Sequence, residues 1–367
     1  MKILIPILGF GRAGGYRVLS QLATEWINQG HNVDFLCPDS SETPYFPTSA
    51  GILYISSTQG ITCQRAIRSK SGIRYKLQAL FNGLLRIGKR YDIILANDSL
   101  TTWPVSFASC GNAKKFYYIQ AYEPEYFSLI KNIKSTVLKW FSEKSYDFNI
   151  IQICNAPIYI GYKNISAKEW VPPGIDFDLF YPNQLDKKNL ALAEEIILGC
   201  IGRHEPSKGI QYALEAFEIL YLKDQRFRLY VAFGNLPLNW THPGLKVVMP
   251  ENDKELGAFY RSLDILLAPG TVQLGAPHYP VMEGMACGVS VVNTGYLPAN
   301  NNNSWIIEIC SASSIVAAVN NILSDSNRNI KINKSLEDIA SFNWESVAKK
   351  MISVFDNSRF TTKNQPI

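Results

Sequence analysis

The stretch ILLAPGTVQLGAPHYPVMEGMACG, residues 265–288, contains the elements that decide the fold. Its first four residues, 265–268, have the length and composition of a short buried strand. Pro280 suits the first turn of a helix, where a missing backbone N–H is tolerated. A strand that leads through a loop into a helix is the repeating unit of α/β proteins with a parallel sheet.

This alternation extends outward along the whole chain. Short apolar strands are predicted at residues 3–8, 32–37, 52–55, 93–96, 116–119 and 150–154, and again at 196–201, 228–233, 246–249, 265–268 and 290–293. The pattern predicts two doubly wound, Rossmann-like parallel sheets. The Pro- and Gly-containing segment 170–176 suits a hinge between them, with the boundary near Pro173.

Length and composition favour two cytoplasmic domains. The chain has 367 residues, 47% of them hydrophobic, which is enough to fill two cores. No apolar run reaches the roughly 18 residues that span a bilayer, and no small-residue cleavage site follows the first apolar run. The seven cysteines are scattered without a CxxC pair, which favours reduced thiols in the cytoplasm.

Positive charge is concentrated in the first half of the chain. Residues 1–170 hold 19 Lys and Arg against 11 Asp and Glu, whereas the remainder holds 17 against 20. The stretch 43–91 has no acidic residue, and its basic residues are Arg65, Arg68, Lys70, Arg74, Lys76, Arg86, Lys89 and Arg90. Such a block favours an anionic partner.

Two basic amphipathic stretches, 81–90 and 130–141, are candidates for this contact. Each mixes apolar side chains with Lys or Arg, as does a helix that lies on an anionic membrane surface. The alternative is a helix packed on a sheet, which also has one apolar and one charged face. We expect no nucleic-acid partner, because no motif of that kind is present.

Loops after three of the predicted strands carry the candidate site residues. GFGRAGG, residues 9–15, precedes a predicted helix at 16–29, so its backbone N–H groups suit a phosphate or sugar; a tight packing turn is the alternative. In GRHEPSKG, residues 202–209, Arg203 and Lys208 would bracket a diphosphate unless both are simply solvated. Glu283 lies one turn into an apolar helix, where ribose hydroxyls, a salt bridge or solvent would satisfy its charge.

Together these motifs resemble the retaining glycosyltransferases of family 4, which have the GT-B fold of two facing Rossmann-like domains with a cleft between them. The resemblance covers nearly the whole chain. It rests on the glycine loop, VPPGID at 171–176, the Arg203 and Lys208 loop, the segment 256–269, and PVMEGMACG at 280–288. It implies an acceptor-binding domain at 1–173, a nucleotide-sugar-binding domain at 174–343, and, at 344–367, a helix crossing back to the first domain plus a tail.

The resemblance also implies roles for individual residues. Catalysis would depend on Arg203, Lys208 and Glu283, of which the first two hold the donor diphosphate and the third the ribose. The remaining donor-binding residues would be Gly14, Gly15, Gly234, Gly275, Pro277, His278 and Tyr279. Acceptor-binding residues would be Asp98, Gln120, Tyr122 and Glu123. Asp98 is alternatively a helix cap, and Glu123 alternatively a solvated side chain.

The implied reaction is transfer of a sugar from a UDP, GDP or dTDP sugar to a glycan or lipid-linked acceptor in cell-surface polysaccharide or glycoconjugate synthesis. The acceptor hydroxyl would attack on the face that the diphosphate leaves, so the β-phosphate receives the proton. No other cofactor is expected, and no metal, because the chain has no Asp-x-Asp pair and its four histidines lack ligand spacing. The location would be cytoplasmic, with peripheral attachment to the inner face of the membrane.

Two features depart from the family pattern. The first of two glutamates eight positions apart is replaced by Gly275, and Gln273 is the nearest substitute. Many members carry a histidine where this chain has IQAYEP, residues 119–124, a segment similar to a rhamnosyltransferase-like subset acting on bacterial surface polysaccharides. A non-catalytic nucleotide-sugar or glycan-binding relative therefore stays open as an alternative, as does a nucleotide-sugar epimerase, which has the same two-domain shape.

Overall fold

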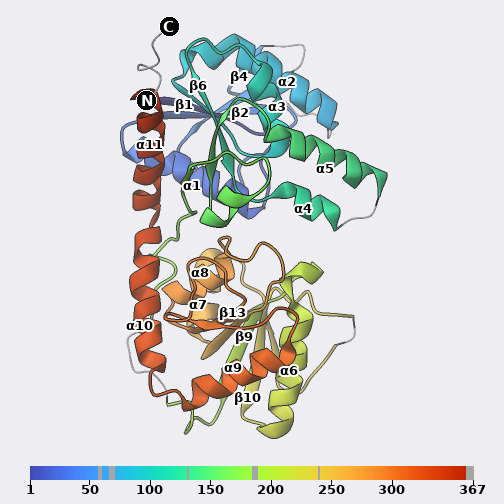
Figure 1. Cartoon of the computed structure of the whole chain (residues 1–367), viewed down its shortest axis with the longest axis vertical. Coiled ribbons are helices and arrows are strands. Elements are labelled where there is room, and N and C mark those ends of the chain that lie inside the picture. The colour runs from blue at the N-terminus through green and yellow to red at the C-terminus, as the bar shows by residue number, and fades with distance from the viewer. Residues whose placement is uncertain (57–59, 66–70, 130–131, 184–188, 239, 361–367) are drawn as a thin grey trace. The chain divides into compact units, whose positions relative to one another are not determined.

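The computed structural model describes residues 1–367 except 57–59, 66–70, 130–131, 184–188, 239 and 361–367. Arg68, Lys70 and Lys131, three of the predicted basic residues, lie outside the described part. The chain divides into two compact units (Figure 1). Unit 1 comprises Met1–Gly174 with Trp344–Ile367, and unit 2 comprises Ile175–Asn343.

Unit 1 is built on an eight-stranded sheet with the order β4-β3-β2-β1-β5-β6-β7-β8. Every pairing is parallel except that of β3 with β4. The chain winds outward from β1 in both directions, so the strand order reverses between β1 and β5. The strands are β1 (Lys2–Pro6), β2 (Asn32–Pro38), β3 (Gly51–Ile55), β4 (Ile61–Thr62), β5 (Ile93–Ala96), β6 (Lys114–Ile119), β7 (Ile151–Cys154) and β8 (Glu169–Trp170).

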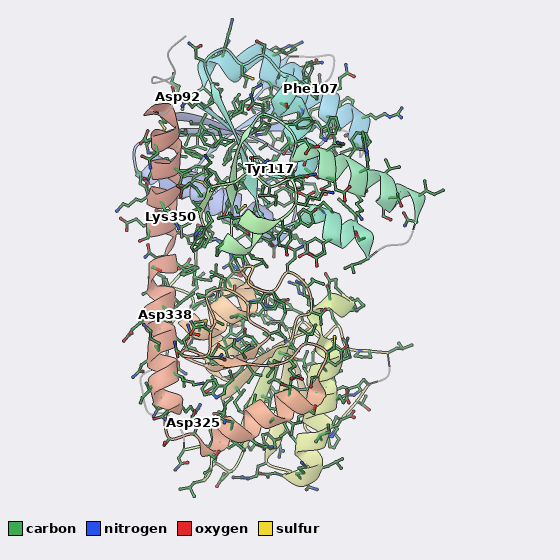
Figure 2. The ribbon with its side chains drawn as sticks, viewed as in Figure 1. Asp92, Phe107, Tyr117, Asp325, Asp338 and Lys350 are labelled. Atoms are coloured by element: carbon green, nitrogen blue, oxygen red, sulfur yellow. The ribbon has the colours of Figure 1, made fainter. Side chains whose placement is uncertain are left out.

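Helices cover both faces of this sheet. Helix α1 contacts α11, while α2, α3 and α5 form a second contacting group, with α4 against α5. The indole N–H of Trp26 on α1 donates to the Ala348 carbonyl of α11 at 3.2 Å. Tyr117, on β6, is 1% exposed within this unit (Figure 2). The helices are α1 (Gly14–Asn28), α2 (Ile73–Ile87), α3 (Ser99–Phe107), α4 (Glu123–Ser128), α5 (Ile133–Ser145) and α11 (Trp344–Phe360).

Unit 2 has a six-stranded sheet in the order β11-β10-β9-β12-β13-β14, with every pairing parallel. Its order reverses between β9 and β12. In such sheets, ligands bind beyond the carboxyl ends of the strands at the point of reversal. The strands are β9 (Ile196–Ile201), β10 (Phe227–Ala232), β11 (Leu245–Val248), β12 (Ile265–Ala268), β13 (Ser290–Asn293) and β14 (Trp305–Ile306).

Alternation along the buried strands supplies two separate cores in unit 2. On β12, Ile265 and Leu267 point into one core, and Leu266 and Ala268 into the other. The first core contains side chains of α6 (Ile210–Lys223) and α9 (Ala312–Ser324). The second contains side chains of α7 (Asp253–Arg261), α8 (Tyr279–Ala286) and α10 (Arg328–Ile339). Helices on both faces therefore fix the carboxyl edge of the sheet.

The predicted fold class is confirmed, because both units are α/β with doubly wound, largely parallel sheets. Each strand expected from the sequence lies within two residues of an observed strand. The strand expected at 228–233 lies at Phe227–Ala232 instead, because Phe233 has a φ of 66° and cannot continue it. The two-residue strands β4, β8 and β14 were missed, since so short a segment has no recognisable period.

The seven cysteines are all free, and only Cys63 and Cys310 are exposed. Burial raises the pKa of the Cys154 and Cys200 thiols to about 12. The buried thiols therefore stay protonated and unreactive at neutral pH.

We predict that Gly209→Ala destabilises unit 2 more than Gly295→Ala does. Both glycines have positive φ angles, 72° and 96°, so each substitution costs about 1–2 kcal/mol of backbone strain. A Cβ at position 209 would lie 2.0 Å from the Pro269 carbonyl oxygen, whereas one at position 295 meets nothing within 4 Å. We expect the overlap to cost about another 1–3 kcal/mol. Urea unfolding of both variants tests this, and equal losses would contradict it.

Candidate functional site

The loop after β9 places Arg203 and Lys208 at the carboxyl edge of unit 2. Arg203 is exposed, and Lys208, which ends the short 3-10 helix Pro206–Lys208, is partly buried. Gly209 follows in the left-handed conformation and starts α6. The geometry of this turn sets the positions of both cations relative to the ends of β9 and β12.

This loop lies against the end of β10. A Cβ on Gly202 would be 1.6 Å from the Gly234 carbonyl oxygen, and the Asn235 side-chain amide donates to the Gly202 carbonyl at 3.1 Å. Phe233, Gly234 and Asn235 have consecutive positive φ angles of 66°, 62° and 52°. Non-glycine residues in this conformation are strained, and such strain concentrates at functional sites.

The loop after β12 is fixed by hydrogen bonds from two sides. The Thr271 N–H donates to the Ser207 carbonyl at 2.9 Å, which ties this loop to the loop that holds Lys208. From the other side, the Thr294 hydroxyl donates to the Gly270 carbonyl at 2.6 Å, and the Tyr296 hydroxyl to the Val272 carbonyl at 2.9 Å. The loop thus has little freedom to move relative to the two cations.

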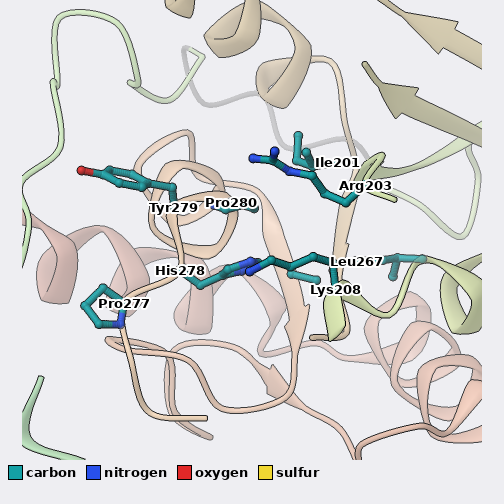
Figure 3. Close-up of a pocket in the computed structure, with 9 residues that line it drawn as sticks. Ile201, Arg203, Lys208, Leu267, Pro277, His278, Tyr279 and Pro280 are labelled. Atoms are coloured by element: carbon teal, nitrogen blue, oxygen red, sulfur yellow. The ribbon is translucent and has the colours of Figure 1, made fainter. Parts of the chain in front are cut away.

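A pocket of about 210 Å³ opens where these loops meet (Figure 3). It lies at the ends of β9 and β12, the point where the strand order reverses. Among the residues that the structure describes, its lining contains two cations and no carboxylate, which suits an anion. The lining residues are Ile201, Arg203, Lys208, Leu267, Ala268, Pro277, His278, Tyr279 and Pro280.

The electrostatics of the pocket follow from its two cations. Burial, and then the Arg203 charge, lower the pKa of Lys208. Burial, followed by Lys208 and Arg203, holds the pKa of His278 well below its usual value, so that imidazole is neutral. The pocket therefore combines two positive charges with an uncharged ring. An anion entering it would relieve the repulsion between the cations.

Glu283 does not line this pocket. It is 2% exposed on α8, and its Oε2 accepts a hydrogen bond of 2.9 Å from the Tyr260 hydroxyl. Its burial excludes the exposed face that the sequence left open as an alternative. Tyr260 lies in the segment 256–269 that carries the resemblance, but nothing in its spacing marks it as the partner of Glu283.

The backbone conformation explains why position 275 is a glycine. Its φ is 88°, a conformation that a glutamate adopts only with strain. Gln273, the suggested substitute, has a φ of 50° and is 5% exposed. The pocket lining includes neither residue, nor Gly234. The backbone conformation of this loop thus disfavours the family's first carboxylate at position 275.

The candidate residues of unit 1 meet at the corresponding edge of its own sheet. Gly14 is exposed at the start of α1, and a Cβ on Gly15 would lie 3.3 Å from the Gln120 side-chain amide. The ring of Tyr122 stacks on that of Tyr146 at 5.6 Å. The glycine loop and the segment 119–124 therefore share one edge of unit 1.

Asp98 and Glu123 form a partly buried carboxyl pair at this edge. Asp98 caps α3 by accepting hydrogen bonds of 2.9 Å from the Leu100 and Thr101 N–H groups, as its alternative interpretation predicted. Glu123 is not solvated: it accepts from the Ser99 N–H at 2.9 Å and from the Ser99 hydroxyl. Burial raises the pKa of Asp98 to about 6; burial and then the Asp98 charge raise that of Glu123 to about 7.

Among the described residues, no three His, Cys, Asp or Glu side chains gather as a metal-binding group.

We predict that the Glu123→Gln variant becomes more stable relative to the wild-type protein as the pH rises. The raised pKa means that the folded state holds a proton that the unfolded state loses at lower pH, so wild-type stability falls between about pH 4.5 and 7.5. Gln keeps an acceptor for the Ser99 N–H but does not titrate. Melting temperatures of both proteins over this range test the prediction, with Glu125→Gln on the same helix as control. A constant difference across the range would contradict it.

Comparison with known proteins agrees with this geometry. Residues 195–325, which contain the pocket, match the protein family described as Glycosyl transferases group 1. No curated protein matches the chain in sequence.

Solved structures match over both units. Sucrose-phosphate synthase from Thermosynechococcus elongatus is 16% identical over 98% of this chain and 99% of that one, with a TM-score of 0.75. HepE from Anabaena, in complex with UDP and glucose, is 14% identical over 97% and 100%, with a TM-score of 0.68. WaaG, a glycosyltransferase involved in lipopolysaccharide biosynthesis, is 15% identical over 96% and 99%, with a TM-score of 0.67. At these identities the similarity establishes the fold. The chain therefore has the GT-B fold of these structures, and residues 195–325 of its second unit match the group 1 glycosyl transferase family.

Proposed function

We propose that this protein is a retaining, metal-independent glycosyltransferase that uses a nucleotide-diphosphate sugar. The observation that carries the proposal is the pair Arg203 and Lys208 in a pocket whose described lining has no carboxylate, at the strand-order reversal of unit 2. Two fixed cations stabilise the negative charge that develops on a departing diphosphate. No metal ion is required for that task.

The step follows from this arrangement. The acceptor hydroxyl oxygen bonds to the anomeric carbon while the bond from that carbon to the β-phosphate oxygen breaks. The hydroxyl proton passes to the departing phosphate oxygen, so charge and atoms balance without a protein base. Arg203 and Lys208 hold the phosphate oxygens, and the enzyme contributes mainly positioning and stabilisation of the leaving group.

The pocket is too small for a whole nucleotide sugar. Its volume of about 210 Å³ is below the roughly 300–1,000 Å³ of typical ligand pockets, so it suits the diphosphate and the adjoining part of the sugar. The base would lie toward Phe233, Gly234 and residues 249–252. HepE binds UDP and glucose. We therefore place UDP before GDP and dTDP as the nucleotide of this chain.

The acceptor is assigned to unit 1. Gln120 and Tyr122 lie at the edge where the glycine loop ends, beside the carboxyl pair Asp98 and Glu123. Hydroxyl-rich acceptors suit this mixture of amide, phenol and carboxyl groups. We assign a glycan or lipid-linked acceptor and a role in cell-surface polysaccharide or glycoconjugate synthesis in the cytoplasm.

An exposed apolar face on helix α5 of unit 1 would suit contact with a membrane and thus a lipid-linked acceptor. On α5, Ile133, Val137 and Trp140 are 87%, 48% and 51% exposed, and their spacing places them on one helix face. Lysines at 134, 139 and 144 add positive charge to the helix. We propose that this α5 face rests on an anionic membrane surface.

Helix α2 differs from α5, although both stretches were candidates. Leu84 and Ile87 of α2 are buried, whereas Leu85, at 43%, and Ile73 at the start of the helix, at 44%, are exposed, so most of its apolar face packs into unit 1. The alternative of a helix packed on the sheet thus fits α2. No described helix is long and apolar enough to cross a bilayer.

We predict that UDP or UDP-glucose binds the protein and raises its melting temperature. The Lys208→Ala substitution should weaken this nucleotide binding at least about tenfold, because it removes one charge-assisted contact. Lys223→Ala, at the exposed end of α6, is the matched control and keeps the shift. GDP, dTDP and ADP, with their sugars, complete the panel. No shift with any nucleotide would overturn the donor assignment.

Binding without turnover would point to the second candidate, a non-catalytic nucleotide-sugar-binding relative. The glycine at position 275, in place of a carboxylate, is the observation that favours it. Hydrolysis of the donor in water separates the two, because an active transferase slowly hydrolyses its donor and a binding protein does not.

Sedimentation with phosphatidylglycerol vesicles tests the α5 face. We predict that replacing Ile133, Val137 and Trp140 together by Ser weakens binding at least about tenfold, because three apolar side chains are lost from the contact. Leu222→Ser is the control, since Leu222 is 85% exposed on α6 and outside this face. Equal binding of both variants would contradict the proposal.

A further inference from the structure

The amino-terminal edge of the sheet in unit 1 carries a groove that the proposed reaction does not use. The groove consists of two adjoining pockets of about 520 and 550 Å³, which share Asp34, Arg90 and Tyr91. Lys2 and Asn32, the first residues of β1 and β2, also line the first pocket. The candidate acceptor residues follow the carboxyl ends of the strands, so they lie at the opposite edge of the same sheet.

Asp34 has a fixed position where the two pockets meet. Its Oδ2 accepts a hydrogen bond of 2.7 Å from the Tyr91 hydroxyl. Gly51 is its partner in the register of β2 and β3, and a Cβ there would lie 2.1 Å from Oδ1 of Asp34, so a larger residue would displace the carboxyl group. Burial, and then the hydrogen bond to Asp34, raise the pKa of Tyr91, so the phenol stays a neutral donor. Asp34 is therefore a preorganised acceptor for a ligand in the groove.

Positive charge surrounds this acceptor. Arg86, in the last turn of α2, and Arg90 line the second pocket, and both are exposed. Together with Lys2 they outnumber Asp34, which is the one carboxylate in the described lining. The two arginines belong to the stretch 43–91, which has no acidic residue and whose anionic partner the α5 face does not explain. A guanidinium binds a carboxylate through two parallel hydrogen bonds.

The lining chemistry selects among anionic partners. A dense polyanion such as nucleic acid would place charge beside Asp34, which repels it, and a bilayer surface is too broad to enter either pocket. An acidic saccharide instead has hydroxyls that donate to Asp34 and carboxylates that meet the guanidinium groups. Thr62 and Asn32 add a hydroxyl and an amide. Each pocket alone lies within the roughly 300–1,000 Å³ of ligand sites, so a ligand that spans both is an oligosaccharide.

We propose that this groove binds a segment of an acidic oligosaccharide, whose carboxylates contact Arg86 and Arg90 and whose hydroxyl groups donate to Asp34. The inference goes beyond the proposed reaction, because the groove belongs to neither candidate site. It lies at the opposite edge of the sheet from the candidate acceptor residues, and it belongs to a different unit from Arg203 and Lys208. A glycan chain bound there stays attached to unit 1 without occupying the donor pocket.

Titration calorimetry of the full-length protein with hexagalacturonate, an acidic sugar chain, tests the charge requirement. We expect binding, and we expect Arg86→Gln together with Arg90→Gln to weaken it at least about tenfold, because two charge-assisted contacts are lost. Arg74→Gln together with Lys89→Gln is the matched control and stays within about threefold. It removes the same charge from exposed residues of the same stretch that lie outside the described lining.

Three results of this titration would overturn the proposal. The first is no binding of hexagalacturonate to the wild-type protein. The second is an equal loss of affinity in the two double variants, which would indicate general attraction to a basic surface. The third is equal affinity for neutral maltohexaose, which would remove the need for the arginines.

Replacement of Asp34 separates a saccharide site from a surface that is only basic. On a basic surface, Asp34→Ala would bind hexagalacturonate more tightly, because a repelling charge is removed. In the proposed groove the variant binds at least about threefold more weakly, because an acceptor for a sugar hydroxyl is lost. Unchanged or tighter binding by the Asp34→Ala variant would contradict the proposed contact.

The response to UDP keeps this test separate from the donor assignment. We expect UDP to raise the melting temperature of both double variants as it does that of the wild-type protein, because all four substitutions lie in unit 1. A protein that binds hexagalacturonate as expected but does not respond to UDP would support the groove and count against the donor site. A response to UDP without binding of hexagalacturonate would overturn the groove alone.

Discussion

The candidate site depends on backbone segments that approach more closely than any side chain permits. At the carboxyl edge of unit 2, Gly202 lies against the Gly234 carbonyl, and Gly209 against the Pro269 carbonyl. Each contact joins a loop after one strand to the loop after a neighbouring strand. Parallel sheets bring these loops to one edge, and the absence of Cβ atoms at the glycines lets the loops pack directly against each other. Arg203 and Lys208 lie on one of these packed loops.

The same contacts explain why the site is both charged and rigid. Arg203 and Lys208 repel each other, and burial alone disfavours the charged form of Lys208. A flexible loop would relieve this repulsion by moving the two side chains apart. Hydrogen bonds from Thr271, Thr294 and Tyr296 instead hold the facing loop in place. The pocket thus stays electrostatically unsatisfied, which is the condition for strong differential binding of an anion.

Much of this fold could be predicted from the sequence, because runs such as 93–96 and 265–268 are apolar, short and bounded by loop residues. The positions of Arg203 and Lys208 at one edge followed from the same pattern. The surroundings of Glu283 did not, since Tyr260 reaches it from another helix and no local spacing encodes that contact. The same holds for Glu123, which is fixed by Ser99 from a different helix.

Helices α2 and α5 show a second limit of sequence reasoning. Both stretches combine apolar and basic residues, and their patterns alone do not say which apolar face has a partner. Tertiary packing determines which apolar face is covered: Leu84 and Ile87 are buried in unit 1, whereas Ile133 is 87% exposed. Burial is a tertiary property, so identical periodicities lead to a core helix in one case and to a bare face in the other.

The distribution of thiols has a practical consequence for following motion in this protein. Cys63 belongs to unit 1 and Cys310 to unit 2, and both are exposed, whereas the other five cysteines are buried. A thiol-directed spin label or fluorophore would therefore attach at one position on each unit of the natural sequence. Dipolar spectroscopy or energy transfer between these two labels would report the spacing of the units during turnover, without engineered cysteines.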